Sequence, residues 1–244
     1  DGTVKVSCDC KDTEASYILE MGEGAVYYVD ATEGSDDNDG LSPEKAWKSI
    51  AKVNATTFQP GDQILFQCGE TWTGELMPQG SGVEGCPIVI ASYGEGDKPV
   101  FMPGSDRVLP YFNVATDVLY NVSINNGISF TNQEHWEVRD LEFYDPGYET
   151  TNPRWTYTYR RAINLIAEDV GDLYGFTFDN LTIHGYRGPN TNRGKSSGGL
   201  IVSILSDPYN AANRVPTAIH DISVTNCTMY DLVEMAEGQM TIRE

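Results

Sequence analysis

Short apolar runs separated by Gly, Pro, Asn and Asp dominate the chain from Gly61 onward. The clearest runs are residues 64–67, 75–78, 87–90 and 99–102. Runs of about four residues bounded by turn-forming residues are typical of β-strands, and no helical period returns here with comparable clarity. The pattern therefore predicts an all-β domain.

The chain before these runs has a different pattern. Residues 1–24 are polar and mixed in charge, so we interpret them as a leader or linker, with the folded domain over residues 25–244 and its first strand at 26–29. Ser42 and Pro43 are residue types of a helix N-cap and first turn. Four residues would share the apolar face of that helix: Ala46, Trp47, Ile50 and Val53. An amphipathic helix at this point would cap the exposed first coil of a stacked β fold.

A loose internal repeat supports the stacked arrangement. Residues 136–143, 176–183 and 223–229 match one another, and each segment places one polar residue between two β-runs: Asp140, Asn180 or Asn226. Asn or Asp at the same turn of successive coils can hydrogen-bond along the stack and satisfy backbone groups of a buried bend. Propeller blades have a similar length, but they need four antiparallel strands joined by hairpins. We therefore predict coils with a polar ladder.

A second set of segments recurs between the ladder positions. Residues 161–169 align with residues 199–207, and residues 238–244 look like the next copy. The chain ends on that copy, and repeat arrays need a terminal cap. We therefore expect further coils in the intact protein, so that the domain is truncated at its C-terminus.

Several motifs carry a resemblance to a known family. They are YYVD at 27–30, SDDNDGLSP at 35–43, AWKSI at 46–50, PGDQILF at 60–66 and GETW at 69–72, followed by the coil-like segments 136–143 and 179–185. They resemble secreted bacterial right-handed parallel β-helix proteins of the pectate-lyase-like superfamily. The resemblance implies this fold over about residues 25–244, but it identifies no subfamily and transfers no catalytic residue.

The same resemblance implies an extracellular, carbohydrate-active protein. We expect a polysaccharide-degrading enzyme, with a glycoside hydrolase favoured over a polysaccharide lyase, acting on a plant cell-wall or other polymer, including one that contains uronate. The alternative is a non-catalytic cell-surface β-helix that binds glycan or serves as a scaffold. Fold alone does not decide between them.

Composition excludes several other partners. The chain has 16 Lys and Arg against 36 Asp and Glu, a formal net charge of -20 at pH 7. Such a charge repels nucleic acid and anionic membranes, and no apolar run approaches the 18 or so residues of a membrane-spanning helix. We expect a monomer that binds polysaccharide and neither nucleic acid nor membrane.

Paired carboxylates are the candidate catalytic groups. Matching positions in neighbouring coils lie about 4.8 Å apart, which is near the separation of a retaining glycosidase pair. In the alignment above, Asp169 and Asp207 match and Glu168 lies beside them. One would act as the acid and another as the nucleophile or base. The alternative is that both aspartates cap turns.

Basic and aromatic residues cluster in two loops that precede matching strands. The basic ones are Arg154, Arg160, Arg161, Arg187, Arg193 and Lys195, and the aromatic ones are Tyr148, Trp155, Tyr157, Tyr159 and Tyr186. Flat rings beside cations suit a groove for a uronate-containing polymer. The predicted substrate contacts are Trp155, Tyr157, Tyr159, Arg160, Arg161 and Arg187. In a lyase, an Arg or Lys would take a proton while calcium or a second cation neutralises the carboxylate. Alternatively, the rings pack beneath their own loops with Arg over them.

The sequence also contains candidates for a metal site and a disulfide. Asp37 and Asp39 lie in an oxygen-rich run that could bind calcium, although a tight Asx-rich turn explains the run equally well, and we expect no required cofactor. Cys68 and Cys86 are the candidate disulfide. Cys227 fits a buried, inert thiol.

Overall fold

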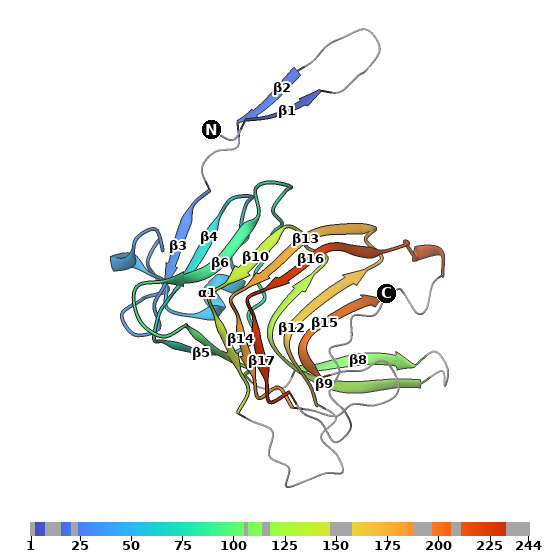
Figure 1. Cartoon of the computed structure of the whole chain (residues 1–244). Helices are drawn as coiled ribbons and strands as arrows, with labels where there is room; N and C mark the ends of the chain where they lie inside the picture. Colours follow the sequence, from blue (N-terminus) through green and yellow to red (C-terminus); the bar gives the residue numbers. More distant parts are fainter. Residues whose placement is uncertain are drawn as a thin grey trace.

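The computed structural model describes residues 3–7, 16–20, 24–104, 107–113, 118–146, 158–187, 197–205 and 211–232. Nearly all regular structure is β, and most of it lies in three sheets with parallel pairing (Figure 1). Helical structure in these residues is limited to α1 (Ile50–Asn54) and two 3-10 turns, η1 (Pro43–Lys45) and η2 (Ala211–Asn213). The all-β prediction is confirmed.

The first sheet has six parallel strands. In spatial order they are β3 (Val26–Val29), β4 (Gln63–Gln67), β6 (Ile88–Tyr93), β10 (Trp136–Arg139), β13 (Asp172–Asp179) and β16 (Ala218–Thr225). The second sheet has five, namely β5 (Thr71–Thr73), β7 (Val100–Met102), β11 (Glu142–Tyr144), β14 (Thr182–His184) and β17 (Thr228–Tyr230).

The third sheet contains the longest strands. In spatial order they are β8 (Arg107–Asn113), β9 (Val118–Thr131), β12 (Thr158–Glu168) and β15 (Gly198–Leu205). β8 and β9 pair antiparallel, whereas β9, β12 and β15 are parallel. β1 (Thr3–Ser7) and β2 (Ser16–Glu20) form a separate antiparallel pair within the segment that we interpret as a leader or linker (Figure 1).

The chain visits the three sheets in a fixed order. From β10 onward each circuit adds one strand to the first, second and third sheet in turn, as β10–β11–β12 and then β13–β14–β15. Trp136 pairs with Phe176, which pairs with Ile222, so successive circuits stack in register. The connection from the third sheet back to the first has three residues (169–171) after β12 and twelve (206–217) after β15. Strands of successive circuits therefore lie next to one another within each sheet.

The apolar core fills the space enclosed by the three sheets. Aromatic rings from successive circuits contact one another, with centroid distances of 4.8 Å for Phe66–Phe101 and 5.6 Å for Phe101–Phe143. Trp136 is 1% exposed; it packs against Phe130 at 5.1 Å. Each circuit therefore buries its apolar side chains against both neighbouring circuits.

The predicted capping helix is wrong in one respect. Its four apolar residues are buried as expected, but the helix is broken into η1 and α1. Trp47 lies between them in extended backbone, because its N–H and C=O bond to Tyr28 and Asp30 beside β3. α1 then starts at its own cap, Ser49, whose hydroxyl accepts from Lys52 N at 3.2 Å. Pairing with a strand outweighs the helical pattern here.

The polar ladder is confirmed in part. Asp140, Asn180 and Asn226 all have left-handed backbone with φ between 50° and 60°, and Asn180 Nδ2 donates to Asp140 Oδ1 at 2.7 Å. Asn226 instead donates to Asp179 Oδ1 at 2.8 Å. The side chains of Asn180 and Asn226 are exposed, so the ladder lines the surface rather than a buried bend.

The cysteines do not form the expected bond. Cys68 and Cys86 are both free thiols. Gln63 of β4 pairs with Val89 of β6, so Cys68 follows one strand and Cys86 precedes the other, at opposite ends of the pair. Cys227 is half-buried, and burial raises the pKa of its thiol, in line with the predicted inert residue.

Asp36 organises the turn before α1. Its carboxylate accepts hydrogen bonds from Lys48 N, Ser49 N and Ser49 Oγ at 2.9, 2.9 and 2.6 Å. Partial desolvation raises the pKa of Asp36, but the bonds from Ser49 and Lys48 lower it by more, so the pKa lies below its ordinary value. The ionised form is therefore the one that stabilises the fold.

Replacing Asp36 with alanine is expected to lower the free energy of unfolding by about 1 kcal/mol at neutral pH. Because the folded pKa is below the unfolded one, this contribution is present above the unfolded pKa of about 3.9 and is lost as the pH falls through the folded pKa. Urea unfolding of both proteins at several pH values measures the difference. Asp37→Ala is the control, and a difference unchanged in acid would contradict the assignment.

Candidate functional site

The corner between the second and third sheets brings two connections together. β11 pairs with β14, and β12 pairs with β15. The connection from β11 to β12 and the connection from β14 to β15 therefore start next to each other and end next to each other. Arg160 N also donates to Ser197 Oγ at 3.1 Å, linking the two exits. The predicted adjacency of the two basic loops is confirmed at these ends. Trp155 and Tyr157 lie outside the described residues.

Two ion pairs flank this corner. Arg160 Nη1 lies 2.5 Å from Asp145 Oδ2, and these side chains are only 13% and 1% exposed. Arg187, after β14, pairs with Asp231, which follows β17 in the next circuit, and both side chains are about 40% exposed. Two of the three arginines predicted to bind substrate, Arg160 and Arg187, therefore each have a carboxylate partner.

Our sequence analysis missed both carboxylates, although a signal was present. The same Tyr-Asp pair ends two strands of the second sheet. Tyr144 and Tyr230 are the last residues of β11 and β17, and Asp145 and Asp231 follow them directly. A Tyr-Asp pair that recurs at one turn of the stack places the tyrosines in one column and the aspartates in another.

The first column is a stack of rings on the second sheet. Tyr144, His184 and Tyr230 are register neighbours, and their ring centroids are 4.4 and 4.7 Å apart with nearly parallel planes. His184 Nε2 lies 2.9 Å from Glu142 Oε1. The stack is a rigid aromatic edge next to the ion pairs.

A pocket of about 130 Å³ opens beside this column. It is lined by Tyr144, Asp145, Pro146, Gly185, Arg187 and Asp231. Sites for drug-sized ligands occupy roughly 300–1,000 Å³. The pocket is therefore suited to a single ring or its polar substituents.

A row of polar side chains crosses the third sheet. In the register of β9 and β12, Asn126 pairs with Arg161 and Ser129 pairs with Asn164. Glu75 from the preceding circuit joins the row through hydrogen bonds to Asn126 and Ser129.

This row is buried and hydrogen-bonded. Glu75 Oε1 accepts from Asn126 Nδ2 at 2.8 Å and from Ser129 Oγ at 2.6 Å. Arg161 Nη1 donates to Asn164 Oδ1 at 3.1 Å. Arg161 is 8% exposed, and burial lowers its pKa to about 10. The row ties successive circuits together.

Two predicted substrate contacts are buried. Tyr159 is only 2% exposed. Arg161 lies within the buried row, over the Tyr159 ring and 6.0 Å from its centre, which is a cation–π geometry.

The predicted catalytic pair does not have the predicted register. Arg161 pairs with Gly198 and Ile163 with Leu200, which is one residue away from the alignment that made Asp169 and Asp207 equivalent. Asp207 lies outside the described residues, and the exposed Glu168 ends β12, where its N–H bonds to Asn132 Oδ1 at 2.8 Å.

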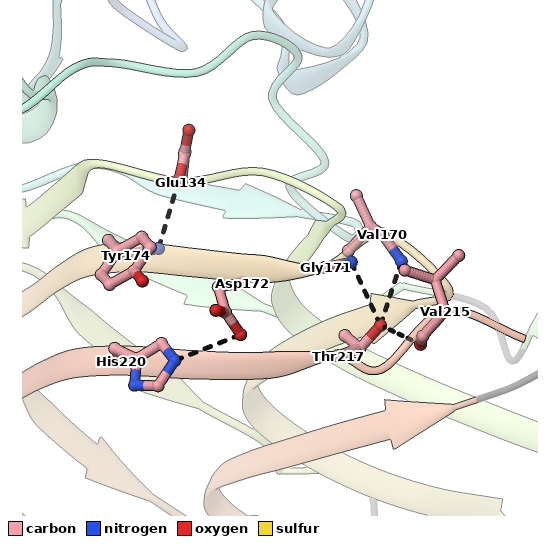
Figure 2. Close-up of polar contacts among 8 residues, drawn as sticks. All are labelled: Glu134, Val170, Gly171, Asp172, Tyr174, Val215, Thr217 and His220. Carbon is pink, nitrogen blue, oxygen red and sulfur yellow. Dashed lines mark hydrogen bonds and ion pairs between the residues drawn. The ribbon is translucent and has the colours of Figure 1, made fainter.

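Asp169 belongs to a tight turn fixed to the next circuit. It has left-handed backbone, with φ of 46°, and its carboxylate accepts from Val215 N at 2.9 Å. Figure 2 shows the rest of this turn: Thr217 Oγ1 accepts from Val170 N and Gly171 N and donates to Val215 O. These contacts are those of a turn-capping aspartate.

An exposed group of polar side chains lies next to this turn on β13 and β16 (Figure 2). The rings of Tyr174 and His220 stack at 4.8 Å, and His220 Nε2 is 3.4 Å from Asp172 Oδ1. Glu134 Oε2 accepts from Tyr174 N at 3.3 Å. These contacts are between neighbouring strands and stabilise the stack.

The two calcium candidates, Asp37 and Asp39, contact nearby protein groups. Asp39 Oδ1 accepts from Leu41 N at 3.0 Å, and Asp39 lies 3.7 Å from Lys45; Asp37 N donates to Ser35 Oγ. Within the described residues, no group of three or more His, Cys, Asp or Glu could hold a metal ion. The same residues include no helix long and apolar enough to cross a membrane.

Comparison with known proteins places this fold among carbohydrate-active enzymes. No family model matches the chain. The crystal structure of a GH136 lacto-N-biosidase from Eubacterium ramulus, as a selenomethionine derivative, superposes with a TM-score of 0.70 and 25% identity over 85% of this chain and 34% of that chain. The native form of the same enzyme gives a TM-score of 0.65 at 24% identity.

Two curated proteins are also similar in sequence. A lacto-N-biosidase of Bifidobacterium longum subsp. longum is 27% identical over 206 residues, covering 72% of this chain and 13% of that protein. An alpha-1,3-galactosidase A of Akkermansia muciniphila is 33% identical over 79 residues, which is 32% of this chain and 12% of that protein. The chain thus spans only a small part of the curated relatives it matches.

Proposed function

We propose that this chain is part of a secreted bacterial glycoside hydrolase built on a right-handed parallel β-helix. The observation that carries the proposal is the similarity to a lacto-N-biosidase structure over 85% of the chain. The fixed order in which the chain visits the three sheets, and the parallel pairing of successive circuits, support the β-helix assignment. The substrate we propose is an oligosaccharide that carries lacto-N-biose, the disaccharide named in the relatives.

A hydrolase is favoured over a lyase because of the relatives' activities and the corner's charges. A lyase needs a basic residue near the uronate and a cation to neutralise the carboxylate. At the described part of the corner, Arg160 and Arg187 are both held by carboxylates. Nothing in the relatives' names supports a uronate-containing or plant cell-wall polymer.

The test uses the intact protein with lacto-N-biose glycosides, α-1,3-galactosides and a pectic polymer. We expect reducing ends from a lacto-N-biose substrate without a new ultraviolet absorbance. Absorbance at the double bond of an unsaturated uronate would identify a lyase. Glycan binding without turnover of any substrate would favour the non-catalytic alternative.

Metal removal is expected to leave this activity unchanged. A retaining or inverting glycosidase uses two carboxyl groups, and neither group needs a metal ion. Activity measured after dialysis against EDTA, and again after calcium is restored, checks the expectation. A loss that calcium reverses would contradict it and would revive the calcium-assisted lyase.

A further inference from the structure

We propose that the pocket between Arg187 and Asp231 holds one neutral sugar unit of the substrate and rejects an anionic one. The proposal rests on the proposed function and adds the location and charge preference of one subsite. The pocket has the size of a small polar group or single ring, and it opens beside the two connections that flank the corner.

The charge of the pocket is balanced before any ligand enters. Its two carboxylates, Asp145 and Asp231, are paired with Arg160 and Arg187 respectively. A uronate or sulfate would have to displace Asp231 from Arg187 while approaching Asp145. Like charges at short range are unfavourable, and the net charge of -20 adds to this repulsion.

The pocket nevertheless offers hydrogen bonds to hydroxyl groups. Arg187 binds Asp231 through Nη2 and Oδ1, and its side chain remains 40% exposed, so its other guanidinium N–H groups can donate to a ligand. Within the part of the chain that the structure describes, the Asp231 carboxylate makes no other hydrogen bond or ion pair, so its second oxygen can accept a hydrogen bond from a hydroxyl. A hydroxyl group can donate and accept at once, which matches this adjacent donor and acceptor.

An aromatic wall completes the site. Tyr144 lines the pocket and is fixed by its stack on His184. Pro146 and Gly185 supply the remaining walls, so the lining is compact and its polar groups are held by neighbouring circuits. Sugar rings are commonly recognised by such a combination of one ring and a few fixed polar groups.

Asp231→Asn provides the decisive test. The change keeps the shape of the side chain but frees Arg187, so the KM for a neutral lacto-N-biose glycan is expected to rise about tenfold, the loss of one charge-assisted hydrogen bond. The KM for the same glycan carrying a sulfate is expected to fall. Arg187→Gln should also raise the KM for the neutral glycan, but without any gain for the sulfated one.

Glu137→Gln is the matched control. Glu137 forms an exposed pair with Arg139 at 3.1 Å on the first sheet, away from the corner. Circular dichroism and the unfolding midpoint check that each variant is folded. If wild type cleaves glycans but Asp231→Asn and Arg187→Gln behave like Glu137→Gln on both substrates, the pocket assignment is overturned and the proposed function stands. If wild type neither cleaves nor binds glycans, both are overturned.

Discussion

Replacing Asp145 with asparagine is expected to lower the free energy of unfolding by about 3 kcal/mol. Removing one partner from a buried ion pair leaves an uncompensated charge, which costs about 3–5 kcal/mol. The Asp145 side chain is 1% exposed and that of Arg160 is 13% exposed, so water can solvate the remaining guanidinium only in part. The lower end of the range is therefore appropriate.

Guanidinium chloride unfolding of the variants measures this effect. The exposed pair Arg139–Glu137 supplies the control, since Glu137→Gln breaks a surface pair worth about 0–1 kcal/mol. Replacing both Asp145 and Arg160 with amides should recover part of the loss, because the stranded charge is then gone. Equal effects of the Asp145 and Glu137 changes would mean that the pair at the corner is solvated.

Trp136→Ala is expected to cost more, about 3–5 kcal/mol. The indole is 1% exposed and contacts Phe58 and Phe130. Its Nε1 also donates to Gly80 O at 3.2 Å, so the variant loses a hydrogen bond as well as packing. Since β10 pairs with both β6 and β13, the cavity would weaken contacts on two sides.

The denaturation midpoint and slope measure the loss of stability in each Trp136 variant. Trp136→Phe keeps much of the volume and should cost clearly less than Trp136→Ala. A loss below about 1 kcal/mol for the alanine variant would show that the neighbouring rings close the cavity, contrary to the close packing of interiors.

The sequence predicted the stacked architecture because its signals are local. Asp140 and Asn180 stand between short apolar runs, and both adopt the left-handed turn that the repeat requires. The prediction of a continuous capping helix was wrong because the apolar pattern does not show that Trp47 pairs with Val29 of β3. The periodicity of apolar residues does not report contacts between segments that are far apart in the sequence.

The candidate site was predicted less well, again for a physical reason. Most residues of β12 are buried whatever their place in the strand, so buried and exposed positions do not alternate there. The apolar pattern therefore did not fix the register, and our alignment was off by one residue, since Arg161 pairs with Gly198. The positions of Arg160 and Arg187 at the corner were found from charge, but their partners needed the register of the stack.

The two connections after β12 and β15 have a consequence for how such proteins diversify. They contain three and twelve residues, yet Glu168 pairs with Leu205 before them and Asp172 pairs with Ala218 after them. The entropic cost of closing a loop grows slowly with its length, by about 0.6 kcal/mol per doubling. Insertions at this edge can therefore accumulate during evolution, or be grafted by design, while the pairing on both sides is preserved.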